Sequence, residues 1–522
     1  MRTQQPPERS RSAARRRLAA VATAAAAALG LTSLSATPAL AADVTHTIAE
    51  VQGTGASTPL AGQTVTVEGV VTGYYAAPSN YRGLYLQTAG SGGDTDATPG
   101  ASDGLFVYFN QAYPEVAVGD LIRVTGTAGE NGGQTQITAT TASAFELVEA
   151  GVGLPAATPL PDTVVGDARE EFEGMLVQPT GDYRLASSHE LYNFGSLWLS
   201  AGGELVKSTE TTDAGPAADA IAASNLARRL IVDDGYSIRV DNAQHVGEQP
   251  YFTTDTVVRN GDRFVAPEKP MVLGYGFDAW RLQPQVPITD ASDAAYKPTF
   301  EPLNPRPASA PEVGGDVQFG AFNVFNYFTT FGGQARGAAN AEQFAKQKAK
   351  IVAAINGLGA DVVALQEIEN SVELGEPVDE ALADLVAGLN AAAGAGTWDY
   401  VPTPDVLTTQ GAEDVIMTAI IYKPSVVTPV GESFADTDAV WDIARKPIAQ
   451  TFDIGNDRLV TVVVNHFKSK SPPSGNTDPE PADGQGFFNA ERVAQAERLA
   501  TFVDTLAADP AKSSDVILLG EF

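Results

Sequence analysis

The segment DVVALQEIEN, residues 361–370, decides how the C-terminal half of this chain is interpreted. A run of apolar residues from Val362 to Leu365 precedes the acidic side chains of Glu367 and Glu369. A short apolar run of this kind is typical of a buried strand, and ligands of α/β sheets collect where strands end. The segment therefore predicts a strand that delivers carboxylates to a site.

Three other strands expected in the same half also end in polar residues. They place Asn323 and Asn326 after the strand in DVQFGAFNVFN (316–326), Asn465 and His466 after 462–464, and Glu521 after the apolar run of DVILLGEF (515–522). One polar strand end is ordinary, but four in one domain predict a shared site.

Helices alternate with these strands. Apolar periodicity and end signals predict helices over 340–357, 378–392 and 489–509, with Asn340 as an N-cap and Gly357 as a stop. Further strands are expected in TAIIYKP (418–424), KPIAQTFDI (446–454) and LVTVVVNHFKS (459–469). This mixture predicts a layered α/β domain over 314–522.

The preceding residues are β-rich instead. Short apolar runs bounded by turn residues, such as QTVTVEGVVTGYY (63–75), predict a small barrel or sandwich over 43–148 and a second β-rich domain over 161–300. The similarity of VAVGDLIRVTG (116–126) to TVVRNGDRFV (256–265) suggests that one barrel-like unit occurs twice. Proline-rich linkers are predicted at 150–160 and 296–315.

The first 41 residues have the pattern of a secretory signal peptide. Six arginines precede an alanine-rich apolar stretch, and Ala39-Leu40-Ala41 is a cleavage site of small residues. We expect a secreted protein, with a membrane anchor as the alternative and attachment to the cell surface left open. The chain contains no cysteine, which excludes disulfides and a catalytic thiol.

Charge restricts the partners. The 522-residue chain carries a net charge of −31, and removal of residues 1–41, with six arginines and one glutamate, lowers it to −36. A surface this acidic repels polyanions, so a nucleic-acid substrate requires a basic groove, bound divalent cations or high salt. A salty environment explains the acidity equally well. No run of 18 apolar residues follows residue 42, so no stable membrane insertion is expected.

The most specific chemistry surrounds His466. This residue lies in VVVNHFKSK (462–470) beside Lys468, a pattern that indicates a general acid or base next to phosphate-binding cations. Arg445 and Lys446 form a second cationic spot. Carboxylate and amide oxygens without cysteine favour Mg²⁺, with Mn²⁺ or Ca²⁺ as alternatives, over zinc. Such a set suits cleavage of a phosphate ester.

Several of these motifs resemble a known superfamily. GAFNVFNYF, DVVALQEIEN, TAIIYKP, ARKPIAQTF, VVVNHFKSK and VILLGEF occur in the order expected of the endonuclease/exonuclease/phosphatase superfamily, which includes DNase I and exonuclease III. NHFKSK and the preceding β domains resemble the extracellular ExeM/NucH-type nucleases of bacteria. The resemblance spans nearly all of the chain after the signal peptide. It implies an α/β fold, a DNase I-like four-layer sandwich preceded by OB-like modules.

The resemblance also implies roles for individual residues. The metal ligands would be Glu367 and Asn323, the catalytic residues His466, Asn323 and Glu521, and the substrate-binding residues Arg445, Lys468 and Asn326.

The sequence departs from the superfamily pattern at its C-terminal end. Glu521 stands where the superfamily has an aspartate in a Gly-Asp-x-Asn motif, and neither the asparagine after Phe522 nor a later Ser-Asp-His-type motif is present. We expect that the sequence is a fragment of a longer protein, with a truncated gene as the alternative. Part of the active site would then be absent, and apolar faces and strand edges would be uncovered.

These observations predict a secreted, metal-dependent endonuclease that hydrolyses phosphodiester bonds of extracellular DNA, with RNA as a further substrate. One alternative is a phosphodiesterase of the same superfamily with a substrate other than nucleic acid, such as a phospholipid or a sugar phosphate. Another is a non-catalytic OB-type binding or attachment protein with a relic nuclease domain. The sequence does not indicate an oligomeric state.

Overall fold

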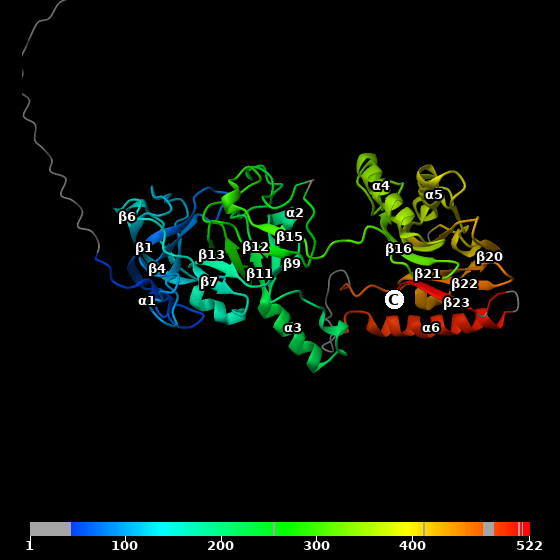
Figure 1. The fold of residues 1–522 in the computed structure, drawn as a ribbon, viewed down its shortest axis with the longest axis horizontal. Coiled ribbons are helices and arrows are strands. Elements are labelled where there is room, and N and C mark those ends of the chain that lie inside the picture. The colour runs from blue at the N-terminus through cyan, green and yellow to red at the C-terminus, as the bar shows by residue number, and fades with distance from the viewer. Residues whose placement is uncertain (1–42, 254–255, 411–412, 473–484, 510–511, 514) are drawn as a thin grey trace, which may run out of the picture. The chain divides into compact units, whose positions relative to one another are not determined.

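The computed structural model describes residues 43–253, 256–410, 413–472, 485–509, 512–513 and 515–522. The predicted signal peptide lies outside these residues. From Val44 to Phe522 the chain forms one unit, whose described part contains four β-sheets (Figure 1). None of the described helices combines the length and apolar character needed to cross a bilayer.

The first sheet closes into a ring of five strands. Its elements are α1 (Ile48–Gln52), β1 (Thr64–Tyr75), β2 (Gly83–Gln87), β3 (Gly104–Tyr108), β4 (Leu121–Asn131), β5 (Gln134–Thr138) and β6 (Phe145–Glu149). The long strand β1 pairs with β4 along 64–70 and with β2 along 70–75, so the order β1-β2-β3-β5-β4 returns to β1. Valines and leucines of β1, β2 and β4 fill the interior.

The second sheet has nine strands in the order β15-β12-β9-β10-β11-β14-β13-β8-β7. Its elements are β7 (Thr158–Pro161), β8 (Leu176–Thr180), β9 (Tyr183–Ser187), α2 (Leu191–Phe194), β10 (Leu197–Ala201), α3 (Pro216–Arg228), β11 (Arg229–Val232), β12 (Arg263–Val265), β13 (Met271–Gly276), β14 (Ala279–Gln283) and β15 (Thr299–Glu301). This order differs from that of the first sheet, so the two similar sequence segments do not occupy equivalent strands: 116–126 contributes to the long β4, and 256–265 to the short β12.

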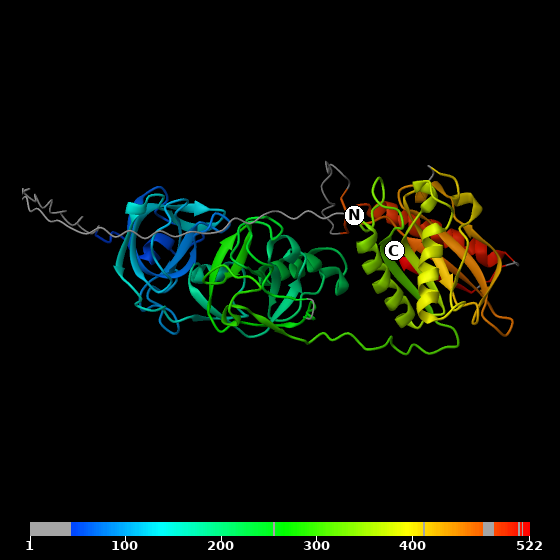
Figure 2. The same ribbon diagram turned by 90° about the horizontal axis from the view of Figure 1, so that it is seen from above.

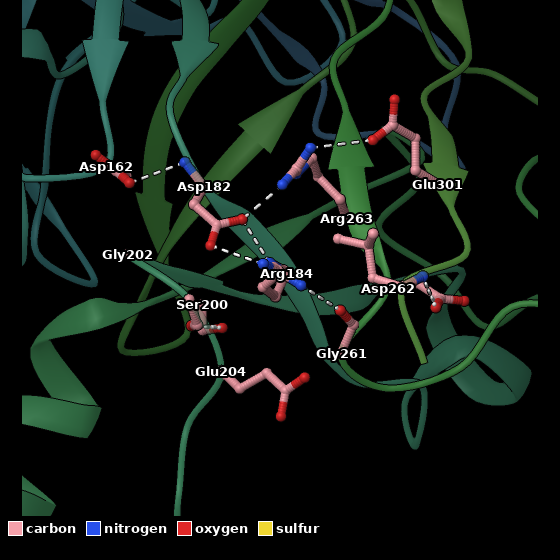
Figure 3. Close-up of polar contacts among 12 residues, drawn as sticks. Asp162, Asp182, Arg184, Ser200, Gly202, Glu204, Gly261, Asp262, Arg263 and Glu301 are labelled. Atoms are coloured by element: carbon pink, nitrogen blue, oxygen red, sulfur yellow. Dashed lines mark hydrogen bonds and ion pairs between the residues drawn. The ribbon is translucent and has the colours of Figure 1, made fainter. Parts of the chain in front are cut away.

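Both predicted linkers contain a strand. Thr158–Pro161 forms the edge strand β7, and Pro159 and Pro161 are tolerated there because proline has no N–H to donate and an edge strand has a ladder partner on one side only. Thr299–Glu301 forms β15, which pairs with β12. Ion pairs hold this end of the sheet: Arg184 donates to Asp182 at 2.5 Å, and Arg263 NH1 donates to Glu301 at 3.2 Å (Figure 3).

The C-terminal region contains two four-stranded sheets. The first, ordered β16-β17-β19-β18, comprises β16 (Phe319–Tyr327), β17 (Val362–Glu369), β18 (Asp399–Tyr400) and β19 (Ile416–Tyr422). The second, ordered β20-β21-β22-β23, comprises β20 (Thr428–Ala435), β21 (Arg445–Asp453), β22 (Leu459–His466) and β23 (Val516–Glu521). The helices of the C-terminal region are α4 (Ala341–Leu358), α5 (Glu380–Ala393) and α6 (Asn489–Ala508).

Three apolar clusters stack these elements in layers. One joins the two sheets through Ala364 and Ile420 on one side and Phe452 and Val462 on the other. A second packs α4 and α5 on the outer face of the first sheet, and a third packs α6 on the second sheet (Figure 1). Figure 2 shows α4 and α5 side by side. The region is therefore a mixed α/β structure with helices outside and sheets inside.

The element boundaries differ from the sequence prediction at a few points. Asn340 caps α4, as predicted, and its side chain accepts a hydrogen bond from the amide of Gln343. The helix continues through Gly357 and ends at Leu358, and the next residue, Gly359, caps it with a left-handed φ of 77°. Helix α3 and strand β20 were not predicted, because α3 buries only Ala218 and β20 contains no buried residue, so neither has a clear apolar pattern.

Candidate functional site

Two neighbouring strands of the first C-terminal sheet are bulged where Asn323 and Glu367 lie. The parallel register of β16 and β17 shifts after Asn323, so that two additional residues of β16 lie opposite the end of β17. The register of β17 with β19 also shifts between Leu365 and Ile368. Because a bulge re-aims side chains, both strands leave their regular pleat here.

The bulges have an unusual backbone. Phe325, Asn326 and Glu367 have left-handed φ angles of 52°, 52° and 62°. Residues other than glycine adopt this region with strain, and such strain clusters at functional sites. The amide of Asn326 donates to Oε2 of Glu367 at 3.1 Å, and the amide of Phe325 donates to Oδ1 of Asn323 at 2.7 Å. The backbone of β16 thus fixes the orientation of Glu367 and Asn323.

The second C-terminal sheet contributes His466 and Glu521. These residues end the parallel strands β22 and β23 and are direct register partners. His466 Nε2 lies 3.5 Å from Oε2 of Glu521. The preceding residue, Gly520, has a φ of 119°, and a Cβ there would lie 2.0 Å from the carbonyl oxygen of Asn465. Only glycine allows the two strand ends to approach this closely.

Glu521 links the two sheets. Its Oε1 accepts a hydrogen bond from Nδ2 of Asn323 at 2.6 Å, while its Oε2 faces His466. The structure therefore brings together Asn323 and Glu367 of the first sheet with His466 and Glu521 of the second.

Arg445 lies next to His466. It begins β21, is the antiparallel register partner of His466, and places NH1 3.5 Å from Nε2 of the histidine. Its other terminal nitrogen, NH2, lies 3.2 Å from Oδ2 of Asp414, and Oδ1 of Asp414 is 2.8 Å from NH2 of Arg336. One carboxylate therefore holds two guanidinium groups at the rim of the site.

The surroundings keep His466 neutral. Only 5% of His466 is exposed, and this burial lowers the pKa of its imidazole. The positive charge of Arg445 lowers this pKa further, whereas Glu521, Glu367 and Asp414 raise it. The pKa of Arg445 is lowered by its own burial and raised by Asp414. A neutral imidazole at physiological pH is available to accept a proton.

Other sequence-predicted residues have different surroundings. The ammonium group of Lys468 lies 4.5 Å from the ring centroid of Phe488. It forms no hydrogen bond or ion pair with the four residues that meet at the site, which are Asn323, Glu367, His466 and Glu521. Asn465 is fully buried and donates to the backbone of Val463 and Leu519. Glu369 is also buried and accepts from Thr330 and Ser371, so it anchors a loop.

Sequence reasoning missed Asp414 and Arg336. A signal for Asp414 was present, because the acidic pair Glu413-Asp414 precedes β19 and the basic pair Arg445-Lys446 begins β21. The two pairs meet: Lys446 Nζ lies 2.5 Å from Glu413, and Arg445 binds Asp414. Arg336 lies in an irregular segment between β16 and α4, where sequence periodicity gives no position.

Metal ligation has a restricted donor set. Among the described residues, no three His, Asp or Glu side chains are grouped so that they alone could hold a metal ion. The oxygen atoms that meet at the site are those of Glu367, Glu521 and Asn323. These are hard donors of the kind that Mg²⁺ and Ca²⁺ bind.

Comparison with known proteins gives similar solved structures only, since no protein-family model and no curated protein matches the chain. One is an endonuclease/exonuclease/phosphatase family protein from Bacteroides thetaiotaomicron, with 14% identity and a TM-score of 0.25 over 39% of this chain and 62% of that chain. A humanized TDP2 from D. rerio has 13% identity and a TM-score of 0.23 over 39% and 60%. The human Nocturnin catalytic domain with bound sulfate has 17% identity and a TM-score of 0.21 over 33% and 56%. The chain thus spans about 60% of the length of these structures.

Proposed function

We propose that this protein is a secreted, divalent-metal-dependent phosphodiesterase that cleaves nucleic acid, with extracellular DNA as its substrate and RNA as a further one. The observation that carries the proposal is the meeting of Asn323, Glu367, His466 and Glu521 at the ends of strands from two sheets, with Arg445 beside them. Secretion rests on the signal-peptide pattern of residues 1–41.

We further propose that the C-terminal region is a DNase I-like sandwich and that the first β region is an OB-like module of the ExeM/NucH type. The layer order of helices, two sheets and helix supports the first assignment. The closed five-strand ring supports the second, because an OB-fold is a five-stranded Greek-key barrel.

The donor set of the site fits Mg²⁺. This ion keeps several water ligands and binds one or two carboxylates plus substrate phosphate, so it does not require a cage of three protein carboxylates. Glu367 would hold the ion, with Asn323 as a second ligand and Mn²⁺ or Ca²⁺ as substitutes. When bound, such an ion polarises a phosphoryl oxygen and stabilises the developing charge.

The protein residues would divide the remaining work. Neutral His466 accepts a proton from the attacking water at Nε2, and Glu521, 3.5 Å from that atom, stabilises the resulting imidazolium. Arg445 offers the developing negative charge on the phosphate a guanidinium group whose position Asp414 fixes. Asn323 holds Glu521 in place through its hydrogen bond.

One observation favours nucleic acid over other phosphate esters. Phe325 lies between Asn323 and Asn326, and 77% of its surface is exposed. A ring exposed beside a phosphate site is a platform on which a base can stack. A phospholipid headgroup has no flat aromatic face that would use it.

Plasmid cleavage with Mg²⁺ tests the proposal. In the intact protein, Glu367→Gln and His466→Gln should each lower the rate at least about 100-fold, since metal ligation and general-base catalysis contribute that much or more. Matched controls are Glu342→Gln, an exposed glutamate of α4, and His189→Gln, an exposed histidine of the second sheet region, which should retain the wild-type rate.

Substrate class is tested with the same proteins. The wild type should cleave plasmid DNA and leave sphingomyelin vesicles intact. Wild-type rates in the Glu367 or His466 variants would refute the site. Hydrolysis of sphingomyelin without cleavage of DNA would show that the protein is a lipid phosphodiesterase and not a nuclease.

A further inference from the structure

A cavity of about 360 Å³ lies between the first β region, which contains strands β1–β6, and the second β region, which contains strands β7–β15. Its wall contains six aromatic side chains, namely Tyr81, Tyr85, Phe106, Tyr108, Tyr275 and Phe277. The volume lies within the range of about 300 to 1,000 Å³ that is usual for small-molecule sites. This cavity is distant in sequence from the phosphate site and has no part in the proposed hydrolysis.

Hydrogen bonds fix the two walls of the cavity to each other. The amide of Tyr74 in β1 donates to the carbonyl of Gln285 at 2.8 Å, and the amide of Leu176 in β8 donates to Oε1 of Gln87 at 2.8 Å. The buried hydroxyl of Tyr75 also donates to the carbonyl of Pro284 at 2.5 Å. The cavity is thus a built feature of two joined regions.

The hairpin at the mouth of the cavity has a turn whose backbone conformation does not suit its two residues and so does not favour folding. Phe277 and Asp278 form the two-residue turn between β13 and β14, with left-handed φ angles of 52° and 57°. Such turns favour Asn-Gly or Asp-Gly, because residues with a bulky side chain resist this backbone region. Phe277 is nevertheless 83% exposed, so its ring gains little from burial. A strained and exposed aromatic residue at a cavity indicates a binding role.

The polar groups of the wall are amides and hydroxyls. Gln134 donates to the hydroxyl of Tyr85 at 2.9 Å, and Gln283 donates to the hydroxyl of Tyr81 at 3.2 Å. Gln283 is 2% exposed, and its Oε1 has no hydrogen-bond partner among the described residues. Buried polar atoms are normally paired, so an unpaired acceptor in the wall suits a ligand that donates.

The charges of the wall argue against an anionic ligand. Among the described residues that line the cavity, Arg281 is the only cation, and its NH1 lies 2.7 Å from Asp233. Asp233 also accepts from the hydroxyl of Tyr81 at 3.1 Å, and Asp278 adds a negative charge at the hairpin. No cationic group is therefore left unpaired for a phosphate, and the net charge of the chain repels polyanions.

We propose that this cavity binds a neutral sugar ring of a glycan. A pyranose presents apolar C–H faces, which pack on aromatic rings, and hydroxyl groups around its edge, which pair with amides and tyrosine hydroxyls. A second cavity of about 380 Å³ shares Tyr81, Phe277 and Arg281 with the first, so the exposed phenylalanine separates two spaces. Two adjacent units of an oligosaccharide would then lie on either side of Phe277.

Titration calorimetry on the full chain tests this site. The probes are the neutral oligosaccharides cellohexaose, maltohexaose and chitohexaose, and single-stranded oligothymidylate serves as the anionic comparison. We expect one neutral glycan to bind at millimolar concentration or below, and oligothymidylate not to compete with it. Phe277→Asn should weaken glycan binding at least about tenfold, as expected for an aromatic anchor.

The variants separate binding from folding. Asparagine suits the left-handed turn, so Phe277→Asn should keep or raise the melting temperature while it removes the ring. Tyr113→Asn is the matched control, because Tyr113 is another exposed aromatic residue with a positive φ, 40°, outside the cavity, and its loss should leave glycan binding unchanged. The proposal is overturned if none of the three glycans binds, if Phe277→Asn binds as the wild type does, or if oligothymidylate binds and depends on Phe277.

Discussion

His466 shows how one side chain acquires its chemistry from its surroundings. The ring lies at the end of β22, almost completely buried, between the guanidinium of Arg445 and the carboxylate of Glu521, each 3.5 Å from Nε2. Burial and the neighbouring cation both lower its pKa, and the carboxylates oppose them. The neutral form therefore persists to lower pH than for an exposed histidine.

This arrangement predicts the pH dependence of hydrolysis. A general base works in its deprotonated form, so the rate should fall only when the pH drops through the lowered pKa, below the ordinary histidine value of about 6.5. Replacing Arg445 by Gln removes one cause of the lowering and should move the acidic limb to higher pH, whatever the remaining rate. The measurement is the pH–rate profile of plasmid cleavage.

The exposed arginine at position 458 supplies the control. Arg458 pairs with Asp316 on the surface, 3.4 Å apart, and Arg458→Gln should keep the wild-type limb. An acidic limb at or above about 6.5 in the wild type would contradict the neutral-base assignment.

The sequence located residues at strand ends correctly and missed residues held by other side chains, and the catalytic and binding roles stay predictions. Asn323, Glu367, His466 and Glu521 follow apolar runs, and that pattern is enough to locate them at the edge of a sheet. Lys468 was predicted from its proximity in sequence to His466, but its side chain packs on Phe488. Residues in irregular segments, such as Arg336, have no periodicity that could place them.

At the scale of the element, the ends of the strands determine the site more than their length. The strands β16, β17 and β21 all change register near the residues of the site, whereas β22 and β23 remain paired from Thr461 to His466 without a shift. The regular pair thus supplies a fixed His466–Glu521 contact, and the bulged strands bring Asn323 and Glu367 towards it.

The close approach of β22 and β23 predicts a large effect of Gly520→Ala. The new Cβ would overlap the carbonyl of Asn465 at 2.0 Å, and the backbone would have to move, so we expect a loss of about 2 to 4 kcal/mol in the free energy of unfolding. Urea unfolding followed by tryptophan fluorescence measures it. Gly455→Ala is the control, because Gly455 also has a positive φ, 87°, but open space around it, and should cost about 1 kcal/mol. Equal losses in the two variants would contradict the close-approach argument.

Sequence patterns also predicted most elements of the C-terminal half to within a few residues. Strong apolar runs such as that of β22 and the capping residue Asn340 give clear signals. Two elements without a clear apolar pattern were missed, since α3 has a single buried residue and β20 has none. The helix α1 was missed for its shortness, because four of its five residues are buried but five residues show no helical period. Pairing with β21 holds β20, and packing against the first sheet holds α1, and the local sequence reveals neither contact.

At the scale of the whole molecule, a buried acidic group makes the stability of the fold depend on pH. The side chains of Asp234 and His245 are fully buried and lie 3.4 Å apart. Burial raises the pKa of Asp234 to about 7, and the hydrogen bond that His245 Nε2 donates to Asp234 raises the pKa of His245. Both shifts mean that the folded state binds more protons than the unfolded state in the range from acidic to neutral pH.

Stability should therefore fall as the pH rises through this range. The contribution of Asp234 is complete below the pKa of an unfolded aspartate, about 3.9, and declines until the pH reaches about 7, because over this range the unfolded state releases a proton that the folded state still holds. Asp234→Asn removes the titrating carboxyl, so its melting temperature relative to the wild type should increase from about pH 5 to about pH 8. Asp241→Asn, at an exposed carboxylate, should show no such increase. A constant difference between Asp234→Asn and the wild type would contradict the linkage.

The strand β15 leaves a shorter connection to the C-terminal region than the sequence suggested. The seventeen residues from Pro302 to Gln318 carry no helix or strand and are mostly exposed, and they include four prolines. In the extended form that prolines favour, a segment of this size reaches about 50 Å, at about 3.1 Å per residue. If the two β regions bind a polymer, the linker keeps the hydrolytic site within about 50 Å of the bound polymer. Substrate captured in the same matrix would then meet the enzyme at a raised local concentration without any contact between the two regions.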